Sequence, residues 1–183
     1  MKKDFINSPF HTIPTGNEDL SEVNVIIEIP KGSMIKYEYE KDYGVIKVDR
    51  YLYQYTPFFY DYGLIPQTWM SGDDDPLDAI VLTNVSSFPG ILIAVRPIGV
   101  VCIDDSGERD DKVISVPVKD PRWSSVKSYK DVPAHMLEEL KFFLEHYSAL
   151  QPNKVIKVKS FKDVPEAIAL IKEGIDTYKK KFK

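Results

Sequence analysis

The chain has 183 residues, of which 43% are hydrophobic and 28% charged, enough for one domain with a sizeable core. Its formal net charge of −4 argues against a general nucleic-acid binder, and its single cysteine, Cys102, excludes an internal disulfide. No stretch approaches the roughly 18 apolar residues of a membrane span, and the start has no apolar core of a signal peptide. We therefore expect a cytoplasmic protein with neither membrane nor nucleic-acid partners.

The first third of the chain predicts an arm followed by three strands. Residues 1–21 are polar and predict an extended arm, within a single domain that spans residues 1–183. The apolar run 24–30 predicts the first strand. Residues 34–39 and 45–51 predict the two strands of a hairpin.

Charged residues interrupt these predicted strands. Glu28 lies inside the first apolar run, where an acid either points to solvent or is functional, and taken alone it fits solvent better. Lys36 and Glu38 share one face of the hairpin, because strand side chains alternate with a period of two. Arg50 lies on the second hairpin strand. The aromatic stretch 51–62 then supplies rings for the core, and a tyrosine near a site can also donate to an anion.

An acidic segment follows, with the sequence Gly-Asp-Asp-Asp-Pro-Leu-Asp over residues 72–78. Carboxylates this close repel one another unless a cation neutralises them. Pro76 disfavours a helix at Asp75, so we expect a tight loop that leads into the apolar strand 79–82. Oxygen ligands without cysteine or histidine suit Mg²⁺, Mn²⁺ or Ca²⁺ better than zinc. A solvated acidic turn is the alternative, and this segment alone does not decide between them.

The second half of the chain predicts more strands and then helices. The β-rich run 91–103 is interrupted at Arg96-Pro97 and leads through a second acid-rich turn, 104–112, into a strand at 113–118. Two acidic turns therefore close two separate strand pairs, and each can contribute to one site.

Helical spacing appears only near the end of the chain. Apolar residues recur every three or four positions from Met136 to Leu150 and from Val164 to Phe182, with a short strand predicted at 154–159 between them. Asp163 is a candidate N-cap, and the terminal lysines predict a solvated helix end. About six strands before two helices predict an α+β domain around a small, antiparallel-rich barrel.

The polar residues on these strands and turns mix acids with cations. Carboxylates alone indicate a cation site, whereas carboxylates with Lys, Arg and Tyr indicate cations together with a polyanion. Arg50 can grip a phosphate through two hydrogen bonds, and Lys36 and Lys112 can act as point charges. Metal ions that hold phosphate oxygens and activate water complete a site for phosphoanhydride hydrolysis.

Six short segments carry a resemblance to a known family. They are Val-Ile-Ile-Glu-Ile-Pro (25–30), Ile-Lys-Tyr-Glu (35–38), Val-Asp-Arg (48–50), Tyr-Gly-Leu-Ile-Pro (62–66), Asp-Asp-Asp-Pro-Leu-Asp (73–78) and Arg-Pro-Ile-Gly-Val (96–100). In order and rough spacing they resemble the family I soluble inorganic pyrophosphatases, and Asp-x-Asp-Pro-x-Asp is the most specific of them. The resemblance covers residues 28–147, about two-thirds of the chain.

This resemblance implies both a fold and an activity. The implied fold is α+β, a small OB-like five-stranded β-barrel with flanking strands and two C-terminal helices. The implied activity is Mg²⁺-dependent hydrolysis of pyrophosphate to two orthophosphates, with several Mg²⁺ ions bound. Mn²⁺ or Zn²⁺ can substitute, and Ca²⁺ is expected to inhibit. A homo-oligomer, a hexamer by resemblance, is also expected.

The resemblance also implies roles for individual residues. The direct metal ligands would be Asp73, Asp78, Asp105 and Asp110, with Glu28 in an outer position. Asp75 resembles the carboxylate that takes a proton from the attacking water, and it joins Tyr62, Arg50 and Lys36 as a catalytic candidate. The phosphate-binding positions would be Lys36, Arg50, Tyr62, Lys112 and Tyr147, and Glu38 would support the site. Asp74 stands where the family usually has a small residue and receives no role.

Four features depart from the family pattern. Phe58 replaces a tyrosine, Asp61 replaces an asparagine, and one extra residue separates Tyr62 from Asp73. Ser148 stands where the family has a lysine that reaches a phosphate.

Two lysines are near enough in sequence to be considered as replacements for the cation missing at Ser148. Lys141 lies seven residues earlier, about 10 Å away along a helix axis, which is too far. Lys154 follows the helix and can fold back, but the sequence does not decide whether it does.

Other interpretations fit less well. The Asp-Asp-x-x-Asp pattern of prenyl diphosphate synthases lies on long helices, and this chain is too short and β-rich. An EF-hand requires a glycine and a glutamate that are out of register here. A single-strand-binding OB module needs a basic groove, and the acid-rich turns of this chain would repel a nucleic-acid backbone. A non-catalytic metal- or phosphate-binding relative stays open because of Ser148.

Overall fold

The computed structural model describes residues 8–183 except residues 42 and 73. Its main sheet contains a ring of strands that are neighbours in the order β1 (Val23–Ile29), β4 (Asp61–Leu64), β5 (Asp78–Val81), β8 (Lys112–Pro117) and β6 (Leu92–Asp105). Pairing between β1 and β6 closes this ring of five strands. The β5–β8 pair is parallel, and the other pairs in the ring are antiparallel.

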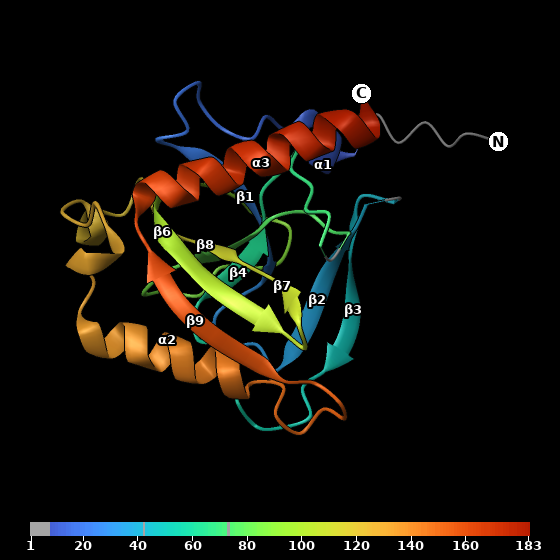
Figure 1. Ribbon diagram of the computed structural model, residues 1–183, viewed down its shortest axis with the longest axis vertical. Coiled ribbons are helices and arrows are strands. Elements are labelled where there is room, and N and C mark those ends of the chain that lie inside the picture. Colours follow the sequence, from blue (N-terminus) through green and yellow to red (C-terminus); the bar gives the residue numbers. More distant parts are fainter. Residues whose placement is uncertain (1–7, 42, 73) are drawn as a thin grey trace.

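Further strands extend from this ring. β7 (Glu108–Arg109) and β9 (Ile156–Lys162) both pair with β6. β2 (Ile35–Glu40) and β3 (Val45–Tyr51) form the predicted hairpin as a separate sheet beside the ring (Figure 1). We call this β2–β3 unit the hairpin. Together with the helices below, the ring confirms the predicted OB-like α+β fold.

Two long helices flank the sheet. α3 (Val164–Phe182) crosses the top of Figure 1, and α2 (Ala134–His146) lies at the lower left. Asp163 caps α3 as predicted, because its side chain accepts a hydrogen bond from the Val164 N–H. α2 ends at His146, earlier than Leu150, and turns follow it. Within the described residues, no helix combines the length and apolarity needed to cross a membrane.

Three local predictions differ from the structure. Residues 9–12 form the short helix α1 inside the predicted extended arm, and Phe10 anchors it by packing against Trp69 and Tyr178. The segment Asp61–Leu64, expected to be part of an aromatic stretch, forms strand β4.

The predicted interruption at Arg96-Pro97 is the third difference, because β6 continues through it. A register shift between Pro97 and Gly99 accommodates the proline, which has no N–H to donate. Gly99 is required at this bend, since a Cβ there would lie 2.5 Å from the Lys162 carbonyl oxygen. The close approach of β9 to β6 therefore depends on a glycine at this position.

Candidate functional site

A charged cavity of about 190 Å³ lies where the hairpin, the strand ends of the ring and the segment after α2 meet. Nine residues predicted from the sequence line it: Lys36, Arg50, Tyr62, Asp75, Asp78, Asp105, Asp110, Lys112 and Tyr147. Glu108, Arg109 and Lys154, which the sequence analysis did not place in the site, line it as well. Asp73 lies outside the described residues. We call this space the charged cavity.

Strand pairing explains why distant residues meet here. β5 and β8 are parallel neighbours, with Ala79 opposite Val113. Asp78 and Lys112 immediately precede these partners and therefore enter the cavity from the same end of the sheet. The two acidic turns of the sequence thus converge on one site. Lys36 and Arg50 are register partners across the hairpin and reach the cavity from its other side.

Lys112 lies at the centre of the acidic side of the cavity. Its ammonium nitrogen is 2.8 Å from Asp78 Oδ2 and 2.8 Å from Asp110 Oδ1, and its side chain is only 6% exposed. Burial opposes its charge, but Asp78, Tyr62 and Asp110 outweigh burial and raise the pKa of Lys112 well above its usual range. Lys112 therefore stays charged and holds the two aspartates together.

Tyr62 donates a hydrogen bond from its hydroxyl to Asp78. Burial and the nearby Asp78 charge raise the pKa of Tyr62 well above its usual value. The hydroxyl consequently keeps its proton and remains a donor at neutral pH.

The other cavity carboxylates also contact lysines. Asp75 forms an ion pair with Lys41 from the hairpin, and Lys154 Nζ lies 2.6 Å from Asp105 Oδ2. Burial raises the pKa of Asp75, while Lys41 opposes that shift. The sequence analysis assigned no role to Lys41, because its contact with the acidic loop arises only in the tertiary structure.

The oxygen-rich lining fits hard cations. Asp75, Asp78, Asp105 and Asp110 each pair with a lysine ammonium, so positive charge already balances these carboxylates in the structure. Among the described residues, no three carboxylate, histidine or cysteine side chains gather closely enough to form a metal cluster by themselves. Because carboxylate oxygens are the ligands that Mg²⁺ prefers, the donor set fits this ion once the lysines are displaced or shared.

The hairpin side of the cavity is also organised by ion pairs. Lys36 Nζ lies 2.8 Å from Glu38 Oε1 and 3.2 Å from Asp49 Oδ2, and Arg50 contacts Asp49 at 2.5 Å. Burial opposes the charge on Lys36, but the hydrogen bond to Glu38 together with the charges of Glu38 and Asp49 outweighs burial and raises the pKa of the ammonium. Glu38 and Asp49 hold the two cations in place. The role of Asp49 was missed, because its contact with Lys36 depends on the strand pairing.

Glu28 is buried behind the cavity. Its sequence context had favoured a position in solvent. It is 7% exposed, and its Oε1 accepts a hydrogen bond of 2.7 Å from the Tyr39 N–H. Its apolar run buries it because both faces of β1 are covered. Burial, with a further contribution from the Asp78 charge, raises the pKa of Glu28 from 4.5 to about 8.

Glu28→Gln should change how stability depends on pH in EDTA. The folded wild type retains the Glu28 proton up to about pH 8, whereas the unfolded chain loses it near pH 4.5, so wild-type stability falls as pH rises through this window. Glutamine can still accept from Tyr39 but does not titrate. The wild type should lose on the order of a few kcal/mol more than the variant between pH 5 and pH 8. Urea titrations at several pH values measure this difference, and parallel pH profiles would contradict it.

The departures from the family pattern occupy different places. Phe58 is buried and packs against Tyr62 and Tyr147, at 5.9 and 5.6 Å between ring centroids. Asp61 is fully buried and accepts a hydrogen bond of 2.7 Å from the Lys31 N–H. Ser148 is 5% exposed and lies outside the residues that line the cavity.

Asp74 and Lys181 make contacts that the sequence did not predict. The Trp69 indole N–H donates to Asp74 Oδ1 at 2.9 Å, and Lys181 also pairs with Asp74. The Lys181 ammonium lies 3.9 Å from the centre of the Trp69 ring. Lys181 is therefore not simply solvated, because it contacts Asp74 and the Trp69 ring.

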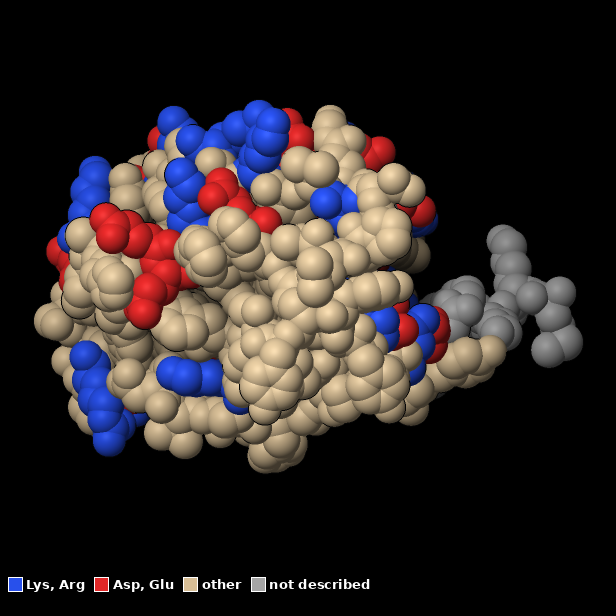
Figure 2. Space-filling model, turned by 90° about the horizontal axis from the view of Figure 1, so that it is seen from below, with Lys and Arg blue, Asp and Glu red and all other residues tan. Residues whose placement is uncertain are grey.

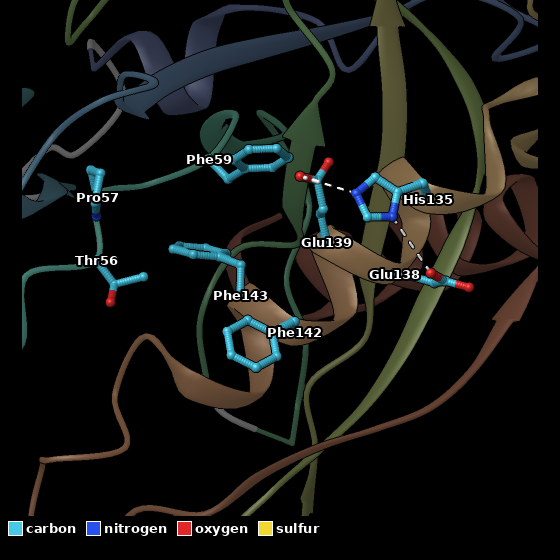
Figure 3. A pocket seen from close by; sticks show the side chains of 8 residues that line it. All are labelled: Thr56, Pro57, Phe59, His135, Glu138, Glu139, Phe142 and Phe143. Carbon is cyan, nitrogen blue, oxygen red and sulfur yellow. Dashed lines mark ion pairs between the residues drawn. The ribbon is translucent and has the colours of Figure 1, made fainter.

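A second cavity is larger, at about 510 Å³, but its lining has a different chemistry. Figure 3 shows Phe59, Phe142 and Phe143 gathered in it. His135 lies at the rim, 3.6 Å from both Glu138 and Glu139.

The face of the molecule in Figure 2 is largely uncharged, with acidic and basic side chains grouped around a broad neutral area. The smaller, charged cavity is therefore the candidate site.

The cavity at the end of this ring of five strands mixes carboxylates with lysines, arginines and tyrosines. Such a lining is typical of enzymes that bind a polyanionic substrate together with cations. Comparison with known proteins agrees with this class. The model of the family described as Inorganic pyrophosphatase matches residues 25–179. The inorganic pyrophosphatase of Picrophilus torridus is 41% identical over 173 residues, covering 94% of this chain and 97% of that protein.

Solved structures agree with the sequence comparison. The crystal structure of inorganic pyrophosphatase from Thermus thermophilus matches with a TM-score of 0.87 and 37% identity, covering 91% of this chain and 97% of that one. A truncated vacuolar soluble pyrophosphatase from Trypanosoma cruzi, solved in complex with PPi, matches with a TM-score of 0.85 and 29% identity, covering 94% of this chain and 78% of that one.

The chain belongs to the inorganic pyrophosphatase family. Membership implies pyrophosphate hydrolysis, so the predicted resemblance and the predicted enzyme class are both confirmed.

Proposed function

We propose that this enzyme hydrolyses pyrophosphate to two orthophosphates in the charged cavity, in a reaction that depends on Mg²⁺ and uses an activated water. The observation that carries this proposal is the convergence of four aspartates with Lys36, Arg50 and two tyrosines in one space of about 190 Å³. The relative from Trypanosoma cruzi that was solved with PPi supports the choice of substrate.

The proposed metal ligands are the carboxylates on the two acidic turns. Asp78, Asp105 and Asp110 would hold Mg²⁺ directly, and the buried Glu28 would support them from behind. Asp73, outside the described residues, is proposed as a fourth direct ligand. Bound Mg²⁺ would polarise the phosphoryl group and favour ionisation of water, and Mn²⁺ or Zn²⁺ can replace it.

The remaining residues would bind substrate and move a proton. Lys36, Arg50 and Lys112 would neutralise phosphate oxygens, with Arg50 able to make two parallel hydrogen bonds. Tyr62 and Tyr147 would donate hydrogen bonds from their hydroxyls. Asp75 lies at the cavity edge, half exposed, where its carboxylate can accept the proton of the attacking water.

Two features of the protein as a whole belong to this proposal by family resemblance. We infer a cytoplasmic enzyme that works as a homo-oligomer, a hexamer by resemblance. Sedimentation velocity of the purified chain tests the oligomer, and a monomer at micromolar concentration would contradict it.

Pyrophosphate should be hydrolysed with Mg²⁺ far faster than a simple phosphate monoester. A monoester lacks the second phosphoryl group, so it cannot engage the cations on both sides of the cavity. Phosphate release from pyrophosphate and from para-nitrophenyl phosphate, each with Mg²⁺ and with EDTA, measures the difference. Comparable rates on the two substrates, or full activity in EDTA, would overturn the proposal.

Calcium should inhibit the Mg²⁺-supported reaction. Ca²⁺ binds oxygen ligands at longer distances and in looser geometry, which misplaces the attacking water relative to Asp75. Titrating Ca²⁺ into an assay at fixed Mg²⁺ measures the inhibition. Undiminished turnover with Ca²⁺ alone would contradict the proposed metal geometry.

A further inference from the structure

We propose that Lys154 supplies the substrate-binding cation that this chain lacks at Ser148. This inference rests on the proposed function of the charged cavity and adds a residue to it. The position of Lys154, the backbone that holds it there and the burial of Ser148 support it in turn.

Lys154 lies inside the charged cavity. It lines the cavity together with Arg50 and Tyr147, two proposed phosphate-binding residues. Its ammonium is 2.6 Å from Asp105 Oδ2, and its side chain is 24% exposed. A lysine ammonium carries three N–H donors, so one can engage Asp105 while the others face a ligand in the cavity.

The backbone holds Lys154 at this position. After α2, the chain turns back through Asn153, whose φ of +62° lies in the left-handed region that asparagine tolerates. The next residue after Lys154 is anchored to the end of β6, because the Ser106 N–H donates to the Val155 carbonyl at 2.8 Å. Ile156 then pairs with Asp105 as β9 begins. Lys154 is thus placed by strand pairing beside Asp105.

Ser148 and Lys141 do not provide an equivalent cation. Ser148 is 5% exposed, and its carbonyl accepts a hydrogen bond from the Gln151 N–H within the turn that leads to Lys154. Lys141 lies on α2, is exposed, and is outside the residues that line the cavity. Of the replacements considered from the sequence, only Lys154 reaches the charged cavity.

The competing interpretation is that Lys154 only balances the charge of Asp105. The two roles predict different effects of removing Lys154 on pyrophosphate affinity and on Mg²⁺ affinity. A substrate-binding lysine contributes to pyrophosphate affinity when Mg²⁺ is saturating. A counter-ion of Asp105 competes with Mg²⁺, so its removal would tighten Mg²⁺ binding and leave substrate affinity unchanged.

The experiment compares Lys154→Met and Lys154→Arg with the control Lys159→Met. Lys159 is on β9, the strand that follows Lys154, is 57% exposed, and pairs with Asp104 at 3.1 Å outside the cavity. Steady-state kinetics with saturating Mg²⁺ give KM and kcat for pyrophosphate. Calorimetry with methylene diphosphonate, which is not hydrolysed, gives substrate-like affinity without turnover.

Lys154→Met should raise KM for pyrophosphate and weaken diphosphonate binding by roughly tenfold or more, as expected for one lost charge-assisted hydrogen bond. Lys154→Arg should recover most of the affinity, and Lys159→Met should match the wild type. Ser148→Lys should bring no comparable gain, because the cation is already supplied and position 148 is buried.

Each alternative outcome has a distinct meaning. An inactive wild type would reject the proposed function itself. An active wild type with unchanged KM and diphosphonate affinity in Lys154→Met would reject only the role of Lys154. A tenfold gain in kcat/KM from Ser148→Lys would also reject it. Should Lys154→Met fail to fold, Lys154→Gln with the same two measurements decides the question.

Discussion

Replacing Asp75 with asparagine is expected to lower turnover of pyrophosphate by roughly 10²–10⁴-fold, the usual contribution of a general base. The amide keeps the size of the side chain but cannot accept a proton from water. Asp75 lies at the edge of the charged cavity, where Lys41 contacts it from the hairpin. Stopped-flow or steady-state assays with saturating Mg²⁺ measure the loss.

Asp78→Asn is the matched comparison for this result. Asp78 contacts both Lys112 and Tyr62 and is a proposed direct metal ligand. Asp75→Asn should leave Mg²⁺ binding, measured by calorimetry, closer to the wild type than Asp78→Asn does. Near-normal turnover in Asp75→Asn would remove this residue from the proton-accepting role.

Lys112→Met should produce the largest loss of stability among the site variants in EDTA. Removing the ammonium leaves Asp78 and Asp110 close together without their cation, and breaking a buried ion pair in this way typically costs about 3–5 kcal/mol. Urea denaturation in EDTA measures the difference. Lys119→Met, a change of the same kind at an exposed position just after β8, serves as the control.

Mg²⁺ should restore part of the stability of Lys112→Met. If Asp78 and Asp110 bind the ion as proposed, the metal replaces the missing positive charge, and mass action stabilises the folded state. Repeating the denaturation across a Mg²⁺ series tests this. A variant as stable as the wild type in EDTA would show that Lys112 does not hold the two carboxylates together.

The fold was largely predictable because its strands and helices follow regular periods. The hairpin, the first strand and α3 were predicted within a few residues, and the cap at Asp163 was predicted from its residue type. β4 was missed because it is four residues long and lies inside an aromatic stretch with no clear alternation. The continuity of β6 was missed because Pro97 normally ends a strand, and the register shift that accommodates it is a property of strand pairing.

The charged cavity was only partly predictable. The acids and cations on the six motifs were found by resemblance, and nine of the predicted residues line one cavity. Lys41, Asp49 and Lys154 were not predicted as site residues, because each reaches its partner through tertiary contacts that no local period reveals. Glu28 was misplaced by its local context, since an isolated acid in an apolar strand does not indicate whether its other face is covered.

The contact between Asp74 and the last turn of α3 links that helix to the loop that carries Asp75. Lys181 pairs with Asp74, and Phe182 packs against Trp69 with ring centroids 5.2 Å apart. Asp74 adjoins Asp75 in the chain, so fraying of the final helical turn would loosen the loop that carries the proposed base. Variants used in a kinetic comparison should therefore keep Lys181 and Phe182 unchanged.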